Sequence, residues 1–173
     1  VEVVRLVPHQ PDFDGAGHTV SYFVVTRAYA GFLGLFGSVT GDIADVTVTD
    51  FTIDATSSKL IYAGGLAGHT TGSITGCAVQ GDITVRSTAS TVYVGLLAGF
   101  AASYTTSTMT LSEFVSSEVR DSYGAGTIDA AAKHFLYAGG LLGKAYNIVI
   151  ADSHAVAAIT ATADLYRVYA GGL

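Results

Sequence analysis

The chain has 173 residues and a formal net charge of −6, with charged residues at 13% and hydrophobic residues at 50%. That is too apolar and too poorly charged for a disordered segment, and the eight scattered Lys and Arg residues argue against a nucleic-acid-binding face. The apolar phrases are short and interrupted by Thr, Ser, Asp and Gly, so none reaches the roughly 20 residues that a membrane span needs.

A glycine-rich phrase recurs along the chain. It reads IYAGGLAG at 61–68, VYVGLLAG at 92–99, LYAGGLLG at 136–143 and VYAGGL at 168–173, with LGLFG at 33–37 as a variant first copy. One leucine marks each copy, at spacings of 31, 31, 44 and 32 residues: Leu35, Leu66, Leu97, Leu141 and Leu173. A second marker keeps step with the first: Ile53, Ile83, Ile128 and Ile159. Two landmarks that move together indicate a true repeat.

Each period contains short runs of alternating or β-branched residues separated by Gly, Ser or Asp, such as SITGCAV at 73–79 and DITVRS at 82–87. No stretch shows an apolar helical face with caps, and AAAKHFLYAGG at 130–140 occupies a strand position in its repeat. We therefore predict an all-β parallel β-solenoid of about five coils, with roughly 31 residues and three short strands per coil. The long third interval predicts one inserted loop near 101–116.

Stacked coils place equivalent side chains above one another, so the leucine markers should form one interior ladder and the isoleucine markers another. The glycine pairs in the repeated phrase permit a corner that a Cβ would obstruct. The single cysteine, Cys77, excludes an intrachain disulfide and is expected to be a small buried side chain.

The same phrases resemble the GLUG motif, a short repeat of bacterial and archaeal surface proteins. GGLAGHTTGSITGCAVQGDI at 64–83 is the closest copy, GGLLGKAYNIVIADSHAVAAI at 139–159 is looser, and DFDGAGHTVSYFVV at 12–25 is similar to the coil that often precedes such repeats. The resemblance implies a right-handed parallel β-helix on or outside the cell, in adhesin-like proteins, and implies no catalytic activity. Where the family usually has Asn, this chain has Gly76, Asp121 and Asp152, so an Asn ladder is absent.

Four tyrosines each precede a leucine marker by four residues, which predicts a column: Tyr62, Tyr93, Tyr137 and Tyr169. An exposed aromatic ladder would suit sugar rings or a neighbouring molecule, because tyrosine has an apolar face and a polar tip. The alternative is plain packing with the phenol tips at the surface.

Charged residues offer weaker candidates. Basic residues recur unevenly as a loosely basic edge that keeps the surface soluble or binds an anionic glycan: Arg27, Lys59, Arg86, Lys133 and Arg167. Asp12, Asp14, Asp42, Asp45 and Asp50 do not repeat as a metal-binding solenoid requires, so we expect turn aspartates, no metal and no cofactor. Asp54 and Asp129 share a register two coils apart and could cleave a glycoside, but no Arg or His flanks them in that register.

These observations lead to one expectation for the whole chain. Residues 1–173 form a single solenoid segment of a longer repeat protein, because the chain starts at Val1 and stops inside the repeated phrase. We expect an extracellular or cell-surface, non-enzymatic structural or adhesive role, with further repeats, other copies or surface glycans as partners. The alternative is a β-helix that binds or cleaves carbohydrate through the tyrosine column or the aspartate face.

Overall fold

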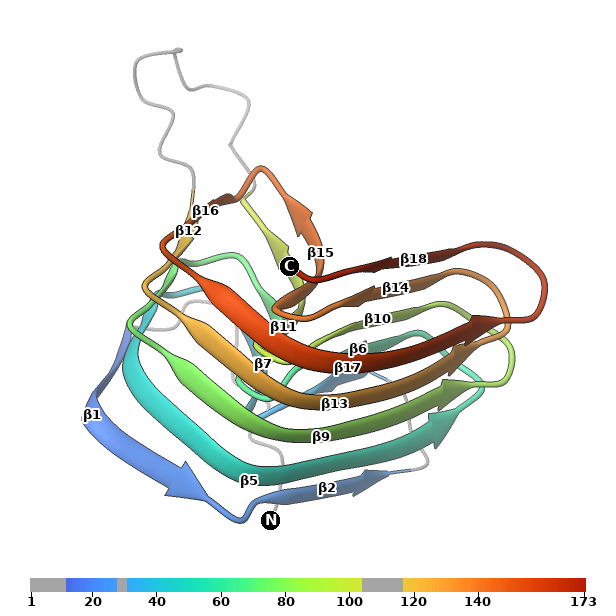
Figure 1. Ribbon diagram of the computed structural model, residues 1–173, viewed down its shortest axis with the longest axis horizontal. Coiled ribbons are helices and arrows are strands. Elements are labelled where there is room, and N and C mark those ends of the chain that lie inside the picture. Colours follow the sequence, from blue (N-terminus) through green and yellow to red (C-terminus); the bar gives the residue numbers. More distant parts are fainter. Residues whose placement is uncertain (1–11, 28–30, 104–116) are drawn as a thin grey trace.

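The structure is a computed structural model that describes residues 12–27, 31–103 and 117–173. All regular elements in these ranges are β-strands, and neighbouring strands pair in parallel. The chain winds through about five stacked coils, as the blue-to-red order of β2, β5, β9, β13 and β17 shows, so the predicted β-solenoid is confirmed (Figure 1). The described ranges hold no helix with the length and apolar character needed to cross a membrane.

Three parallel sheets form the sides of the solenoid. The first sheet has nine strands: β1 (Phe13–Ser21), β2 (Val24–Arg27), β5 (Ile43–Ser57), β8 (Ile74–Thr75), β9 (Ala78–Ser87), β12 (Glu118–Arg120), β13 (Tyr123–Ala132), β16 (Val149–Ala151) and β17 (His154–Ala163). The second sheet has five: β3 (Gly31–Leu33), β6 (Ile61–Ala63), β10 (Val92–Gly95), β14 (Leu136–Gly139) and β18 (Val168–Gly171). The third sheet has four: β4 (Phe36–Val39), β7 (Ala67–Thr70), β11 (Ala98–Ala102) and β15 (Leu142–Tyr146).

Each middle coil contains more strand segments than the three that the sequence analysis predicts. In the middle coils the first sheet receives two segments, a strand of two or three residues and then one of ten residues, such as β8 followed by β9. A corner residue in a left-handed conformation separates the two segments, at Gly76 and at Asp121. Such a residue redirects the strand without ending the sheet, so one coil has four strand segments on three sheets.

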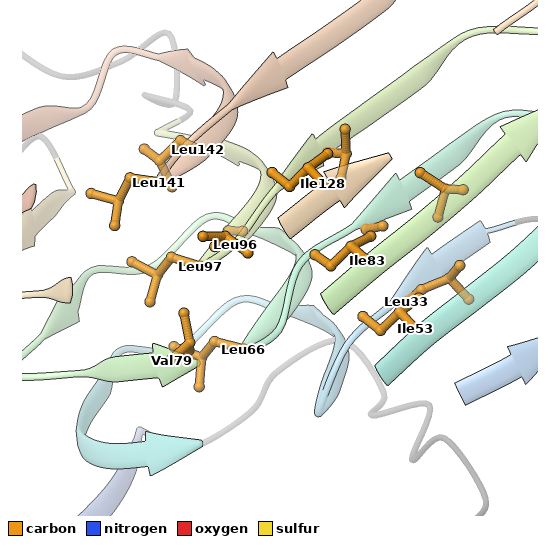
Figure 2. Close-up of a cluster of buried hydrophobic side chains, with 14 of the residues drawn as sticks. Leu33, Ile53, Leu66, Val79, Ile83, Leu96, Leu97, Ile128, Leu141 and Leu142 are labelled. Carbon is orange, nitrogen blue, oxygen red and sulfur yellow. The ribbon is translucent and has the colours of Figure 1, made fainter. Parts of the chain in front are cut away.

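The middle members of the two predicted ladders lie in the interior (Figure 2). Leu66, Leu97 and Leu141 are fully buried, and the backbone N–H of Leu97 donates to the carbonyl of Leu141 over 2.9 Å. The register pairs the isoleucines in one row: Ile53, Ile83, Ile128 and Ile159. Burying a leucine contributes about 1.5–3 kcal/mol, so the ladders are a main source of stability. Leu35 is half-buried and Leu173 is 56% exposed, because they lie on the outermost coils described.

Two glycines make room for an aromatic ring in the core. Phe51 is buried and stacks on Phe23, with ring centres 5.4 Å apart. A Cβ on Gly65 or on Gly81 would lie 2.5 Å from a carbon of the Phe51 ring, closer than any real contact. The glycine positions are therefore fixed by packing as well as by backbone freedom.

The inserted loop lies between β11 and β12. Ala101 pairs with Thr70 and Val119 pairs with Ile74, so 17 residues in this coil stand where the preceding coil has three. The solenoid resumes its register after the insertion. Most of the loop expected near 101–116 lies outside the described residues.

Candidate functional site

A column of aromatic rings runs along the outer face of the second sheet. Tyr62, Tyr93 and Tyr137 alternate with buried neighbours on their strands, so the rings point away from the core. Each tyrosine pairs in register with the next, and adjacent ring centres lie 4.8–4.9 Å apart with interplanar angles of 5–8°. Tyr169 on β18 continues the stack and is 45% exposed. The structure thus brings the four tyrosines into one outward-facing column.

Phe32 extends the column by one further coil. It pairs in register with Tyr62, and the two ring centres lie 5.0 Å apart. The sequence spacing does not predict that Phe32 belongs to the column. The first copy of the repeated phrase is one residue shorter, because Gly34 stands alone where later copies have two residues. Phe32 therefore precedes Leu35 by three residues, whereas each tyrosine precedes its leucine by four.

A second column faces the first from the third sheet. Its members are register partners on β4, β7, β11 and β15: Ser38, His69, Phe100 and Lys144. The Phe100 ring centre lies 5.7 Å from that of Tyr93, and the His69 ring centre lies 5.6 Å from that of Phe32. We call the two columns together the aromatic strip. Each member of the second column follows a leucine marker by three residues, but the residue types differ, so no repeated letter marks the column in the sequence.

Lys144 provides the positive charge of the strip. Its ammonium group lies 4.9 Å from the ring centre of Tyr137, 5.7 Å from Tyr93 and 5.9 Å from Phe100. A cation within about 6 Å of a ring centre is attracted by the negative ring face. Lys144 therefore stabilises the rings of the aromatic strip and places a positive charge on its surface.

Burial changes the acid–base properties of two strip residues. Burial raises the pKa of Tyr93, and the neighbouring Tyr137 and Tyr62 raise it further, so its phenol stays protonated. Burial lowers the pKa of His69 below its usual 6.5, which favours the neutral ring. The Nδ1 atom of His69 lies 3.1 Å from the Ser38 hydroxyl, which holds the imidazole in place.

The stacking limits what the tyrosine column can bind. Sugar rings bind aromatic side chains through the ring face. Tyr62, Tyr93 and Tyr137 each have one neighbouring ring on either side, so their faces are already in contact. Among the described residues, the column presents ring edges and phenol groups along its length, and outer ring faces at its two ends.

The aspartate face is organised around an ion pair. Asp54 and Asp129 both pair in register with Thr84, as expected, and neither Arg nor His shares that register. However, Arg86 reaches Asp129 from the register two residues further along the strands, with its Nη2 atom 2.6 Å from the carboxylate. The guanidinium of Arg86 therefore occupies one side of the Asp129 carboxylate, and both side chains are exposed, as in an ordinary surface ion pair.

The clustered N-terminal aspartates stabilise turns. The carboxylate of Asp12 accepts the Asp42 N–H over 2.9 Å, and the carboxylate of Asp42 accepts the Ser73 N–H over 2.7 Å. Asp45 and Asp50 have left-handed backbones, with φ of 50° and 54°. Across the described residues, no three His, Cys, Asp or Glu side chains gather closely enough to hold a metal ion.

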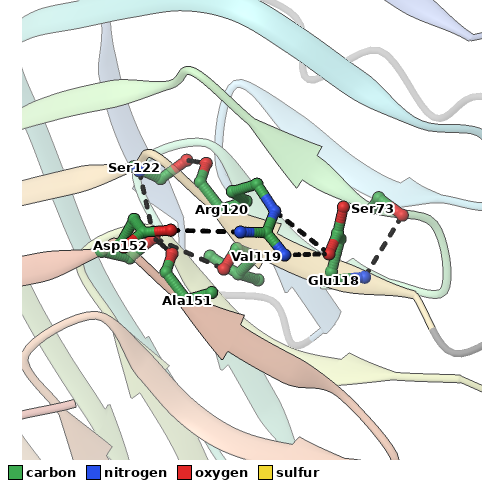
Figure 3. A network of polar contacts seen from close by, with 8 residues as sticks. Ser73, Glu118, Val119, Arg120, Ser122, Ala151 and Asp152 are labelled. Atoms are coloured by element: carbon green, nitrogen blue, oxygen red, sulfur yellow. Dashed lines mark hydrogen bonds and ion pairs between the residues drawn. The ribbon is translucent and has the colours of Figure 1, made fainter.

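A polar network lies at the corner of the first sheet (Figure 3). The guanidinium of Arg120 donates to Glu118 over 3.0 Å and to Asp152 over 3.1 Å, which links two coils. The Ser122 N–H donates to the Ser153 hydroxyl over 3.1 Å. Every group of this network bonds to another coil or to its own strand, so the network braces the corner.

Cys77 belongs to a column of small donors at the same corner. Its thiol donates to the carbonyl of Thr75, two residues earlier, as the Ser122 and Ser153 hydroxyls do to the carbonyls two residues before them. Burial raises the pKa of the Cys77 thiol, which keeps it protonated and unreactive. The expected small buried side chain thus also donates a hydrogen bond.

The recurring basic residues whose side chains the structure describes do not gather into one site. Arg86 pairs with Asp129, and the ammonium of Lys133 lies 3.2 Å from Asp164. Lys59 and Arg167 lie on exposed turns of other coils. The strip cation Lys144, which the basic series did not include, lies apart from them on the third sheet.

Comparison with protein families finds one match, to the GLUG motif, over residues 60–84. These residues run from the start of β6 through the corner at Gly76 into β9, and so cover most of one coil. The chain therefore carries a GLUG motif within a parallel β-solenoid. No curated protein and no solved structure matches the chain.

Proposed function

We propose that this solenoid is an extracellular, non-enzymatic structural or adhesive unit, a building block of a cell surface or of a filament. The GLUG motif at residues 60–84 supports this role, because the resemblance described above implies surface proteins. The ladders inside and outside the solenoid support it as well. They tie each coil to the next along the whole described length, which favours a rigid spacer.

The observation that carries the proposal is the stacking of the tyrosine column. Adjacent ring centres of Tyr62, Tyr93 and Tyr137 lie 4.8–4.9 Å apart, and their planes are nearly parallel. Residues selected to hold a sugar would keep their ring faces open. Rings that cover one another instead reinforce the stacking of coils, as expected of a structural element.

The proposed partners are further repeats or other copies of the chain. Within the described residues, β17 and β18 each pair with a strand on one side, so one edge of each carries backbone groups without a strand partner. Such edges favour the addition of another strand. A further coil in the same register would continue both ladders.

The location is tested on intact cells that produce the natural protein. Protease added outside the cells should release fragments of residues 12–173, while a cytoplasmic marker protein stays whole. The proposal fails if the segment is protected until the cells are lysed. Polysaccharide turnover that Asp129→Asn abolishes would contradict the non-enzymatic part.

A second candidate is the binding of an acidic glycan, which Lys144 favours. Its ammonium group lies beside the phenols of Tyr93 and Tyr137, so cationic and hydroxyl donors face outward together. A glycan array tests this candidate with Lys144→Gln, and Lys133→Gln serves as the matched control because Lys133 is already paired with Asp164. Binding that only Lys144→Gln removes would support the glycan role, and no binding to any glycan favours the scaffold.

A further inference from the structure

The outer end of the tyrosine column holds two phenols in a reactive arrangement. The ring centres of Tyr137 and Tyr169 lie 4.9 Å apart, and the interplanar angle is 7°. The two residues pair in register on parallel strands, so the rings are related by a near-translation along the solenoid. Equivalent ring carbons therefore lie at about the spacing of the ring centres.

We propose that Tyr137 and Tyr169 form an oxidative cross-linking site, at which a peroxidase-type one-electron oxidant joins the two phenols into dityrosine. Each phenol gives up one electron and its hydroxyl proton and becomes a neutral phenoxyl radical. The two radicals form a carbon–carbon bond between ring positions next to the oxygens. The hydrogen on each bonded carbon then returns to its oxygen, which restores two phenols.

The electron balance of this step is complete. Two tyrosines release two protons and two electrons, and one molecule of hydrogen peroxide takes them up and becomes two molecules of water. The protein therefore loses two hydrogen atoms for each cross-link. No metal or cofactor of this chain takes part, because the oxidant is supplied from outside.

The surroundings favour the outer pair over the inner pairs. In the 173-residue chain Tyr169 is 45% exposed, so its electron and proton can pass to an external oxidant and to water. Burial and the neighbouring phenols raise the pKa of Tyr93, which makes proton loss from the inner phenol harder. The Lys144 ammonium lies 4.9 Å from the Tyr137 ring centre, so loss of an electron from that ring before its proton leaves is disfavoured, and oxidation starts at Tyr169.

The geometric change needed is small. The rings must turn about their Cβ–Cγ bonds from stacked to edge-to-edge, while the centre-to-centre spacing stays nearly the same. Neither ring is enclosed in the core, since Tyr137 alternates with buried neighbours on β14 and Tyr169 is its register partner on β18. The strands can therefore keep their pairing while the bond forms.

The cross-link would staple the fifth coil to the fourth. It closes a loop of 31 residues between positions 137 and 169, as a disulfide would, and such a closure restricts the unfolded chain. The chain has one cysteine, so an intrachain disulfide cannot serve this purpose. The biological use of the cross-link rests on the proposed extracellular location, where oxidants of this class act. The chemistry of the cross-link does not depend on that location.

The test treats the purified 173-residue chain with a haem peroxidase and hydrogen peroxide at low protein concentration. We expect dityrosine fluorescence, a monomer lighter by two hydrogen atoms, and a cross-linked peptide that mass spectrometry maps to Tyr137 and Tyr169. Tyr169→Phe keeps a stacked ring but removes the phenol, so this peptide should be lost completely. Thermal unfolding of the cross-linked wild type should shift to higher temperature.

Tyr166→Phe is the matched control. Tyr166 is exposed and stacks on Phe135 with ring centres 4.8 Å apart at 12°, so its geometry is similar but its partner has no phenol. This variant should form the Tyr137–Tyr169 link in full. The proposal is overturned if no dityrosine forms, if it appears only in dimers whose yield rises with protein concentration, or if it maps to another pair. Any of these outcomes leaves the proposed surface role intact, since cell-surface proteolysis tests that role separately.

Discussion

At the scale of single residues, the corner of the first sheet takes a left-handed conformation at the same position of four successive coils. These positions have φ between 50° and 63°: Asp45, Gly76, Asp121 and Asp152. The residue before each of them pairs in register with its counterparts, so the four corners lie one above another. Glycine has no Cβ to obstruct this conformation, and Asp and Asn tolerate it better than other residues. Asp121 and Asp152 therefore form the corner at two of the positions where the GLUG resemblance predicts Asn.

This account predicts how Asp121 tolerates substitution. Asp121→Gly and Asp121→Asn should unfold in urea at nearly the wild-type midpoint, because both residues accept the left-handed backbone. Asp121→Val should lower the free energy of unfolding by about 1–3 kcal/mol, because a β-branched residue is strained there. Equal losses in all three variants would show that the Asp121 carboxylate, and not its backbone, stabilises the corner.

His69 predicts a pH dependence of stability. Its pKa is lowered by burial from 6.5, so the unfolded chain takes up a proton at a higher pH than the folded protein does. The contribution of the neutral His69 ring to the free energy of unfolding is complete above pH 6.5. It is lost as the pH falls towards the folded-state pKa. The surrounding groups, Ser38, Phe32 and Phe100, carry no charge that could offset a protonated ring.

The measurement is urea unfolding of wild type and His69→Phe at about pH 7 and about pH 5. Phenylalanine is the natural choice because Phe100 occupies the same register one coil later. The loss of stability on acidification should be smaller in the variant. Identical losses in both proteins would mean that other groups cause the pH dependence.

At the scale of strands and ladders, the amino-acid sequence predicts those columns whose members are the same residue type. Leucine and isoleucine recur as the same letter at a nearly constant spacing, and so do the tyrosines, so the sequence repeat alone is enough to find these columns. The second column has no such signal, because Ser38, His69, Phe100 and Lys144 share a position but no chemistry. The sequence does not predict the left-handed corners, because residue letters do not specify a backbone conformation. The one sequence signal at these positions is Gly or Asp where the resembled family usually has Asn.

Two leucines from one ladder give a matched pair for testing it. Leu97 is fully buried between coils, so Leu97→Ala should lower the free energy of unfolding by about 2–5 kcal/mol through lost burial and a cavity. Leu173 is 56% exposed, so Leu173→Ala should change it by less than about 0.5 kcal/mol. Chemical denaturation of both variants measures the two changes. Similar losses would contradict the assignment of Leu97 to the core.

At the scale of the whole molecule, stability should vary along the solenoid axis. Each coil contacts only its neighbours, so a coil covered on both sides is more stable than one covered on a single side. The inward side chains of β9, such as Ile83, are fully buried, whereas Ile159 at the same position of β17 is only half-buried. The outermost described coil therefore has the weakest packing although its sequence pattern is the same.

Hydrogen exchange of backbone amides measures this gradient. Paired amides of β9 and β13 should exchange slowest, and those of β17 and β18 should exchange much faster, because the fifth coil can open without unfolding the others. The oxidised wild-type protein provides an internal comparison, since a link between Tyr137 and Tyr169 should slow exchange in β18 and leave β9 unchanged. If all four strands exchange at one rate before oxidation, the coils unfold as a single cooperative unit and the nearest-neighbour description of this solenoid is wrong.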